Sequence, residues 1–411
     1  MAGTAAKPQP ARAGFTAGSL YAFVVLGLPA GMLGVAWPAL RHDFRQPLAS
    51  LGELLLASLV GYLAVTSVTG LALRRFGTAA LLTASAAAAA FGTGVFAATR
   101  SWSVLVLASV LVGAAGGGLD AGLNTAVALT GRTRLMNLIH AAFGVGAALG
   151  PLLVTAALAV TSSWRGAYVV LLVLDVCLVG VWLALRNAVA ALPRRPPGLT
   201  PAAPPGNFRP RLLLSLSLTV FFCYAGIEIA VGSWSASFLR AGPAQLSPAL
   251  AGLAVFGYWA GLTAGRVGAA ALGSRLSPRN AVRAGTVGTI AGAAAIWANI
   301  APAGTVAALV VIGVSLGPIF PALVSLTPER VGPAAAVNVV GWQLAASGVG
   351  GTGLSALTGV VLQQAGLATF GPALTLLAAA MFGLNLLVDM PAGDQRRAKS
   401  HRPLATGCSS D

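Results

Sequence analysis

Long apolar segments separated by short polar stretches recur along the whole chain. Each segment has about 20 residues or more, enough for a helix to cross a hydrocarbon layer of roughly 30 Å. We expect spans near residues 17–40, 50–73, 77–98, 102–129, 137–160 and 166–186, and again near 212–238, 248–271, 281–300, 304–326, 335–363 and 367–390. The pattern predicts an all-α polytopic membrane protein with twelve transmembrane helices.

One polar stretch rich in proline and arginine interrupts this pattern near the middle, at residues 187–211. A cluster of prolines disfavours helix, because proline lacks the amide N–H and clashes with the preceding turn. We therefore predict an N-terminal tail at 1–16, a six-helix bundle at 17–186, a linker at 187–211, a second six-helix bundle at 212–390 and a C-terminal tail at 391–411. We interpret the first apolar segment as a retained helix, because it is longer than a signal-peptide core.

The two halves resemble each other when shifted by about 200 residues. The matches are Ala30-Gly31 with Ala225-Gly226, Gly61-Tyr62 with Gly257-Tyr258, Gly113 and Gly117 with Gly313 and Gly317, and Gly144-Val145-Gly146 with Gly348-Val349-Gly350. They occur in order and in corresponding spans. A tandem duplication explains them, and parallel repeats of this kind are typical of transporters.

Composition excludes a water-soluble globular protein, because 57% of the residues are hydrophobic, only 8% are charged and the mean hydropathy is +0.84. The net charge is 25 − 9 = +16. With a cytoplasmic N-terminus, five of the 25 basic residues fall on the outer side and 25 − 5 = 20 on the cytoplasmic side. The outer ones are Arg41, Arg45, Arg100, Arg165 and Arg240. The positive-inside bias thus explains the charge without a nucleic-acid partner, and it places both termini in the cytoplasm.

No catalytic apparatus is visible in the sequence. The three cysteines, Cys177, Cys223 and Cys408, fit neither a disulfide framework nor a metal site, and we expect free thiols. A nucleotide-binding loop and a cluster of metal ligands are also missing from the sequence. We therefore expect neither an enzyme nor an ATP-driven pump, and no cofactor or metal.

Three acids lie well inside predicted spans, away from the span ends, at Asp120, Asp175 and Glu228. A charge at the bilayer centre costs about 2.5 to 3.5 kcal/mol on insertion scales, so each acid is a candidate functional residue. Asp120 and Asn124 are four residues apart and share one helix face. They form either a cavity wall with a protonatable acid or a hydrogen-bonded lock between helices. Asp175 has no evident partner, and its role stays open.

Glu228 shares a helix face with Tyr224, and Trp234 follows further along the same span. A carboxyl group in apolar surroundings can exchange a proton near neutral pH. Coupling to protons, a hydrogen bond to substrate hydroxyls and a purely structural bond are the three interpretations. His140 is either a proton relay or a structural donor.

Other candidate contacts for a solute are aromatic and amide side chains. They are Tyr258 in the eighth span and Asn338, Trp342 and Gln343 in the eleventh. Aromatic rings and a few convergent polar groups suit a carbohydrate site. Bridging between helices by an amide, or anchoring of a tryptophan at the membrane interface, is the structural alternative.

The stretch Gly70-Leu71-Ala72-Leu73-Arg74-Arg75-Phe76-Gly77 resembles the loop after the second helix of major facilitator superfamily transporters. Gly70, Arg75 and Gly77 match that gating loop, whereas Arg74 replaces its usual aspartate. The resemblance extends over essentially the whole chain. It implies two six-helix bundles, the major facilitator fold, and a secondary carrier.

Three further stretches resemble the fucose-permease-like sugar transporters. They are Gly113-x3-Gly117-Gly118-x-Asp120-x3-Asn124, His140-x2-Phe143-Gly144-x-Gly146-x3-Gly150-Pro151 and Tyr224-x-Gly226-x-Glu228-x3-Gly232-x-Trp234. This resemblance implies symport of a small sugar-like solute with protons, through Asp120, Glu228 and His140. The first span lacks the acid that such symporters tend to carry.

Two alternatives remain open. Gly146-x3-Gly150-Pro151 partly matches the glycine-proline motif of drug-proton antiporters, which favours efflux of drugs or metabolites. A receptor or scaffold that does not translocate its ligand is the other. In each case we expect a monomer in the cytoplasmic or inner membrane.

Overall fold

The computed structural model describes residues 9–130, 132–190, 211–243 and 245–389. Short 3₁₀ turns lie at Leu48–Ser50, Gly273–Arg275 and Leu367–Thr369. The α-helices are α1 Gln9–Asp43, α2 Leu51–Ala98, α3 Trp102–Leu129, α4 Thr133–Thr161, α5 Arg165–Ala190, α6 Arg211–Ala241, α7 Pro248–Leu272, α8 Pro278–Ala298, α9 Pro302–Leu316, α10 Ile319–Val331, α11 Pro333–Ala365 and α12 Phe370–Asp389. The predicted all-α membrane architecture is confirmed in this part of the chain.

The twelve predicted spans all have counterparts. Ten helical stretches among the described residues are long and apolar enough to cross a membrane, and one of them combines α9 with α10. A second one, α2, contains a break at Gly77 and therefore holds two spans. The helix α7, of 25 residues, supplies the twelfth.

The break at Gly77 corrects the prediction of a loop over residues 70–77. Helix continues up to this glycine, whose φ of 82° and ψ of 166° reverse the chain direction at a single residue. Val65 and Ser85, which lie on opposite sides of the break, both pack against Gly118 of α3. The two parts of α2 therefore lie side by side against α3.

Several helices differ in their ends from the predicted spans. The first helix begins at Gln9 rather than at residue 17, and α5 continues to Ala190, into the predicted linker. Within the predicted tenth span, helix is interrupted at Gly317 and Pro318, because proline withholds a backbone donor there. Residues 1–8, 191–210 and 390–411 of the predicted tails and linker lie outside the described residues.

The internal repeat is visible in the helix packing, because glycines at equivalent positions of the two bundles let neighbouring helix backbones approach closely. A Cβ at Gly113 would meet the carbonyl oxygen of Ser58, and one at Gly313 would meet that of Tyr258. Gly61 lies in the same way against Val110, and Gly261 against Val310. The structural partner of Gly61 is therefore Gly261, one turn beyond the predicted Gly257. Small residues at such contacts are typical of helix packing in membranes.

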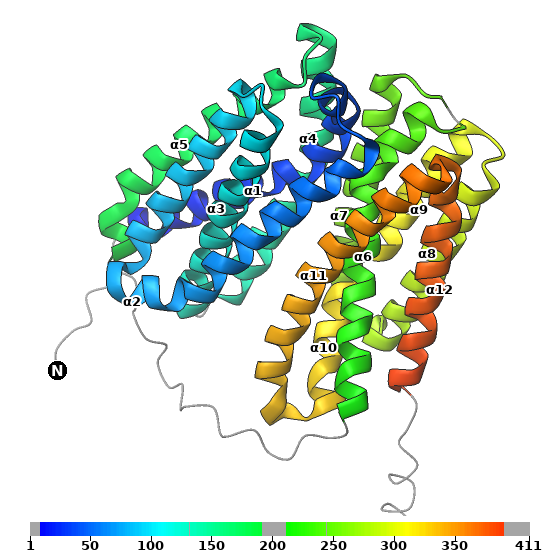
Figure 1. The fold of residues 1–411 in the computed structure, drawn as a ribbon. Helices are drawn as coiled ribbons and strands as arrows, with labels where there is room; N and C mark the ends of the chain where they lie inside the picture. The colour runs from blue at the N-terminus through cyan, green and yellow to red at the C-terminus, as the bar shows by residue number, and fades with distance from the viewer. Residues whose placement is uncertain (1–8, 131, 191–210, 244, 390–411) are drawn as a thin grey trace, which may run out of the picture.

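The two bundles meet mainly at one end of the molecule. Figure 1 shows them together where α4 joins α5 and spreading apart toward the start of α6. At the closed end a Cβ at Gly34 would meet the carbonyl of Gly232, and Gly52 packs on Ala356. The amide of Ala49 also donates to Oε1 of Gln363 over 2.8 Å.

Candidate functional site

Polar groups of both bundles face each other along the contact between α4 and α7. Thr155 packs on Gly252, and a Cβ added at Gly144 would lie 2.7 Å from Oγ1 of Thr263. These two contacts show that the helices run antiparallel. One further turn brings His140 opposite Arg266, and His140 interacts electrostatically with both Asp120 and Arg266. Its ring also packs edge-on against Phe23.

Asp120 is held by neutral donors within the first bundle. The Tyr62 hydroxyl donates to one carboxylate oxygen over 2.7 Å, and Nδ2 of Asn124 donates to the other over 2.8 Å. The predicted pair on one face of the helix is thus observed. Tyr62 comes from α2, 58 residues away, which spacing along one helix cannot reveal.

Glu228 pairs with an arginine inside the second bundle. Nη2 of Arg266 lies 3.4 Å from Oε1 of Glu228 and 3.5 Å from the Tyr224 hydroxyl. The Tyr258 hydroxyl donates to the backbone carbonyl of Glu228 over 2.8 Å. The side chains of Arg266 and Glu228 are 29% and 14% exposed. This part of the site is therefore partly open rather than sealed.

Arg266 is a residue of this site that was not among the predicted candidates. Its charge was counted with the cytoplasmic side, although it lies inside the predicted span 248–271 and within α7, which continues to Leu272. The uninterrupted run of small and apolar residues from Val267 to Leu272 was the signal for this. A cation at this depth is expensive, which makes it a candidate functional residue.

Two predicted solute contacts bridge helices. Trp234 is fully buried, its Nε1 donates to the carbonyl of Ser355 over 2.8 Å, and its ring packs on Gly359. Gln343 is buried, and its amide joins Ser217 of α6 to Thr327 of α10 through bonds of 2.9 Å. In this conformation both side chains are closed to a solute, and the structural alternative applies to them.

The remaining residues predicted in the eleventh span both lie on α11. Trp342 has 47% of its surface exposed. Asn338 belongs to α11 by its backbone, and its side chain lies outside the described part. Unlike Trp234, Trp342 is thus not enclosed by the described part of the chain.

Asp175 turns into the first bundle and has a partner. The Thr93 hydroxyl donates to its carboxylate over 2.8 Å. A cavity of about 30 Å³ lies beside the pair, between α1, α2, α3 and α5. The acid is buried there rather than exposed to lipid.

The residues of the predicted gating loop lie around the break in α2. Arg75 is exposed and lies over the ring of Phe76, 5.5 Å from its centre. Gly70 has open space at its Cβ position. These contacts are local to α2.

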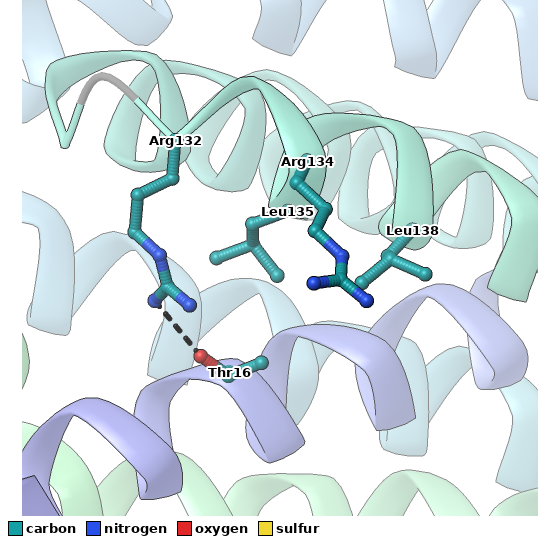
Figure 2. Close-up of a pocket in the computed structure, with 5 residues that line it drawn as sticks. All are labelled: Thr16, Arg132, Arg134, Leu135 and Leu138. Atoms are coloured by element: carbon teal, nitrogen blue, oxygen red, sulfur yellow. Dashed lines mark hydrogen bonds between the residues drawn. The ribbon is translucent and has the colours of Figure 1, made fainter.

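A separate cavity of about 420 Å³ lies at the start of α4 and is lined by Thr16, Arg132, Arg134, Leu135 and Leu138. Nη1 of Arg132 donates to the Thr16 hydroxyl over 3.0 Å, and Figure 2 shows both guanidinium groups directed toward α1. The two arginines and two leucines all come from the α4 side of this cavity, and Thr16 of α1 lies opposite them.

An ion-pair cluster joins the ends of α8, α10 and α12. Arg330 lies 3.0 Å from Asp389 and donates to Asn385 over 2.9 Å. Arg283 lies 3.6 Å from the same aspartate, and Arg279 pairs with Glu329 over 2.7 Å. Arg330 was also assigned to a loop, yet it is buried in α10. This cluster holds three helices of the second bundle together.

Among the described residues, no three His, Cys, Asp or Glu side chains gather as metal ligands would. Cys177 and Cys223 are free thiols.

The chain matches a known protein family over most of its length. The family profile described as Major Facilitator Superfamily matches residues 20–355. A search of curated protein sequences found no significant match. Among solved structures, a mutant of the nucleoside transporter NupG superposes with a TM-score of 0.71 at 15% identity, covering 92% of this chain and 98% of that one.

Two other solved structures are similar to nearly the same extent. A D-xylose-proton symporter gives a TM-score of 0.68 at 14% identity, with 91% of this chain and 98% of that one covered. A bacterial homologue of the human lysosomal transporter Spinster, inward-facing and unoccupied, gives 0.67 at 13% identity, with 93% and 96% covered. Identities this low show a shared fold alone.

Proposed function

The chain belongs to the major facilitator superfamily, and from this premise we propose that it carries a small, hydrophilic, sugar-like solute together with protons. As a member it is a secondary transporter embedded in the membrane, and not an enzyme. The proposal depends mainly on two acids, Asp120 in a span of the first bundle and Glu228 in a span of the second. Each has polar partners.

Protonation of either acid changes the energy of closing the bundles around a dry site. An ionised carboxylate enclosed without water is costly, so a bound proton favours closure. A solute that binds the same state is then coupled to the proton by population shift. In this scheme Asp120 and Glu228 bind the proton and His140 relays it.

The solute site that we propose lies between the bundles. Asn124, Glu228 and Trp342 supply polar and aromatic contacts, and the buried Tyr224 and Tyr258 support Glu228 from behind. Asn338 is included by its position on α11. The two bundles rock about this site, as in other carriers built from repeats. We further propose a monomer in the inner membrane with cytoplasmic termini, so that the open end in Figure 1 faces the cytoplasm.

Reconstituted vesicles test the proposal with labelled sugars, nucleosides and cationic amphiphiles. We expect uphill accumulation of a hydrophilic ring compound under an inward proton gradient. Asp120→Asn and Glu228→Gln should abolish accumulation but retain exchange of solute across the membrane. Uphill transport that survives both substitutions would refute proton coupling through these acids.

The same assay separates the alternatives. Stabilisation and transport of lipophilic cations alone would favour efflux, which the Gly146-x3-Gly150-Pro151 motif supports. Ligand binding without any flux would favour a receptor. The resemblance to fucose-permease-like transporters is what favours a sugar within the panel.

A further inference from the structure

We propose that Arg266 binds a carboxylate of the transported solute, which makes the substrate class a small hydroxylated organic acid such as a sugar acid. This inference rests on the transport function proposed above. It depends on the free donors of Arg266, on its pairing with Glu228 and on its position between the bundles.

The guanidinium group of Arg266 has more donors than its partners use. Arginine offers five N–H donors in a planar fork that matches a carboxylate. Within residues 9–130, 132–190, 211–243 and 245–389, Nη2 alone is engaged, at 3.4 Å from Glu228 and 3.5 Å from the Tyr224 hydroxyl. Both distances are long for a charge-assisted hydrogen bond, which is normally about 2.7 to 2.9 Å. The buried Nε has no acceptor in the part of the chain that the structure describes.

A neutral sugar gives no reason for this cation. Hydroxyl groups are recognised by amides, hydroxyls and carboxylates, which the site already has in Asn124, Tyr224 and Asp120. An arginine within a membrane-spanning helix is costly and needs a compensating anion. Glu228 supplies one only through a single long contact. A solute carboxylate would satisfy the free edge of the fork.

Glu228 then controls whether Arg266 is available. While Glu228 is ionised it competes with the solute for the guanidinium, and a proton on Glu228 removes that competition. Tyr224 and Tyr258 are the other titratable groups beside Glu228, and His140 faces Arg266 from α4.

As far as side chains are described, the remaining helices packed on α6 bring no further titratable group to this point. The described residues of α9 and α11 include none. Those of α10 and α12 belong to the ion-pair cluster at the far ends of these helices. In α1, Tyr21 donates to Leu174, and the charged residues Arg41, His42 and Asp43 lie at the closed end.

This arrangement predicts a stoichiometry. One carboxylate enters with one proton on Glu228, so no net charge crosses the membrane. Symport of a neutral sugar with a proton would carry one positive charge. The effect of membrane potential on uptake therefore separates the two substrate classes.

Binding to the purified full-length protein is the first test, with gluconate and glucuronate compared with glucose at about pH 6 and about pH 8, on either side of neutral pH. We expect the acids to bind and raise thermal stability, more strongly at the lower pH. Arg266→Lys keeps the charge but loses the fork, and should weaken binding of the acids at least about tenfold. Glu228→Gln should keep binding and remove its dependence on pH.

Arg134→Gln is the matched control, because it removes an arginine of the cavity in Figure 2. It should leave binding of the acids and its pH dependence in place. Loss of binding in Arg134→Gln with retention in Arg266→Lys would move the anion site to that cavity and overturn the proposal. His140→Gln is compared with Glu228→Gln, because His140 faces Arg266 from α4. Loss of the pH dependence in His140→Gln and its retention in Glu228→Gln would overturn the role of Glu228.

Transport by reconstituted vesicles completes the test. Uptake of gluconate should respond to a proton gradient and not to membrane potential. If glucose is bound and transported as well as gluconate, and Arg266→Lys changes neither, the anion site is overturned and the proposed carrier function stands. If neither acid binds, the anion site is also overturned. Uptake of the other solutes then tests the carrier function by itself.

Discussion

Trp234 and Trp342, two tryptophans of the second bundle, were both candidate solute contacts but have different surroundings. Trp234 is fully buried between α6 and α11, whereas Trp342 is 47% exposed. Trp234→Ala should lower the free energy of unfolding by about 3 to 5 kcal/mol, because it leaves a cavity. Trp342→Ala should change stability little and reduce solute affinity. Thermal unfolding in detergent and a binding assay measure the two effects.

Equal loss of stability in the two variants would contradict this assignment. Trp234→Phe is the control for Trp234, since it keeps most of the buried ring surface but loses the hydrogen bond to Ser355. It should cost less than the alanine variant.

Part of the site can be predicted from the sequence. Asp120, Glu228 and Asn124 could be located, because polar groups stand out in apolar helices and helix spacing fixes which of them share a face. The Tyr62 hydroxyl on Asp120 could not, because a pairing 58 residues apart depends on tertiary packing. Arg266 was not selected as a candidate and Arg330 was placed in a loop, because a basic residue near the end of a span resembles one in a loop.

At the scale of elements, the break in α2 depends on one glycine. With φ of 82° and ψ of 166°, Gly77 adopts a conformation that is essentially restricted to glycine. Gly77→Ala should therefore destabilise the protein by about 1 to 3 kcal/mol. Gly70→Ala is the matched control, because Gly70 is helical and its Cβ position is open. It should be neutral or slightly stabilising, since alanine favours helix.

Thermal unfolding of both variants checks this prediction. A Gly70→Ala protein as unstable as Gly77→Ala would show that any substitution near the connection is harmful. The positive φ of Gly77 would then not be the cause.

The cluster at the ends of α8, α10 and α12 offers a second test of elements. Arg330→Met leaves Asp389 buried with only the more distant Arg283, and should cost about 3 to 5 kcal/mol. Arg279→Met breaks the pair with Glu329, whose side chain is 60% exposed, and should cost at most about 1 kcal/mol. Unfolding in detergent at low and high salt compares them. A larger loss of stability in Arg279→Met than in Arg330→Met would show that the buried pair is not the one that stabilises the three helix ends.

At the scale of the whole molecule, one end of the two bundles is closed by direct backbone contact. Gly34 meets Gly232 there, and Gly52 meets Ala356. Close approach of this kind fixes the present conformation, because packed surfaces are rigid and change between discrete states. If the bundles rock as proposed, these contacts must open in every transport cycle.

A disulfide across that end tests the motion directly. The Cβ position of Gly52 lies 2.9 Å from Cβ of Ala356, so cysteines at both sites need only a small shift to reach the usual distance of about 3.5 to 4.5 Å. In a background without the native cysteines, oxidation of Gly52→Cys/Ala356→Cys should stop transport, and reduction should restore it. Ala157→Cys/Gly166→Cys is the matched control, with Cβ positions 3.4 Å apart inside the first bundle. Its disulfide should leave transport intact, because that bundle moves as one body. Transport that continues through the oxidised Gly52→Cys/Ala356→Cys protein would show that the solute crosses without opening this end, which rules out rocking of the two bundles as the mechanism.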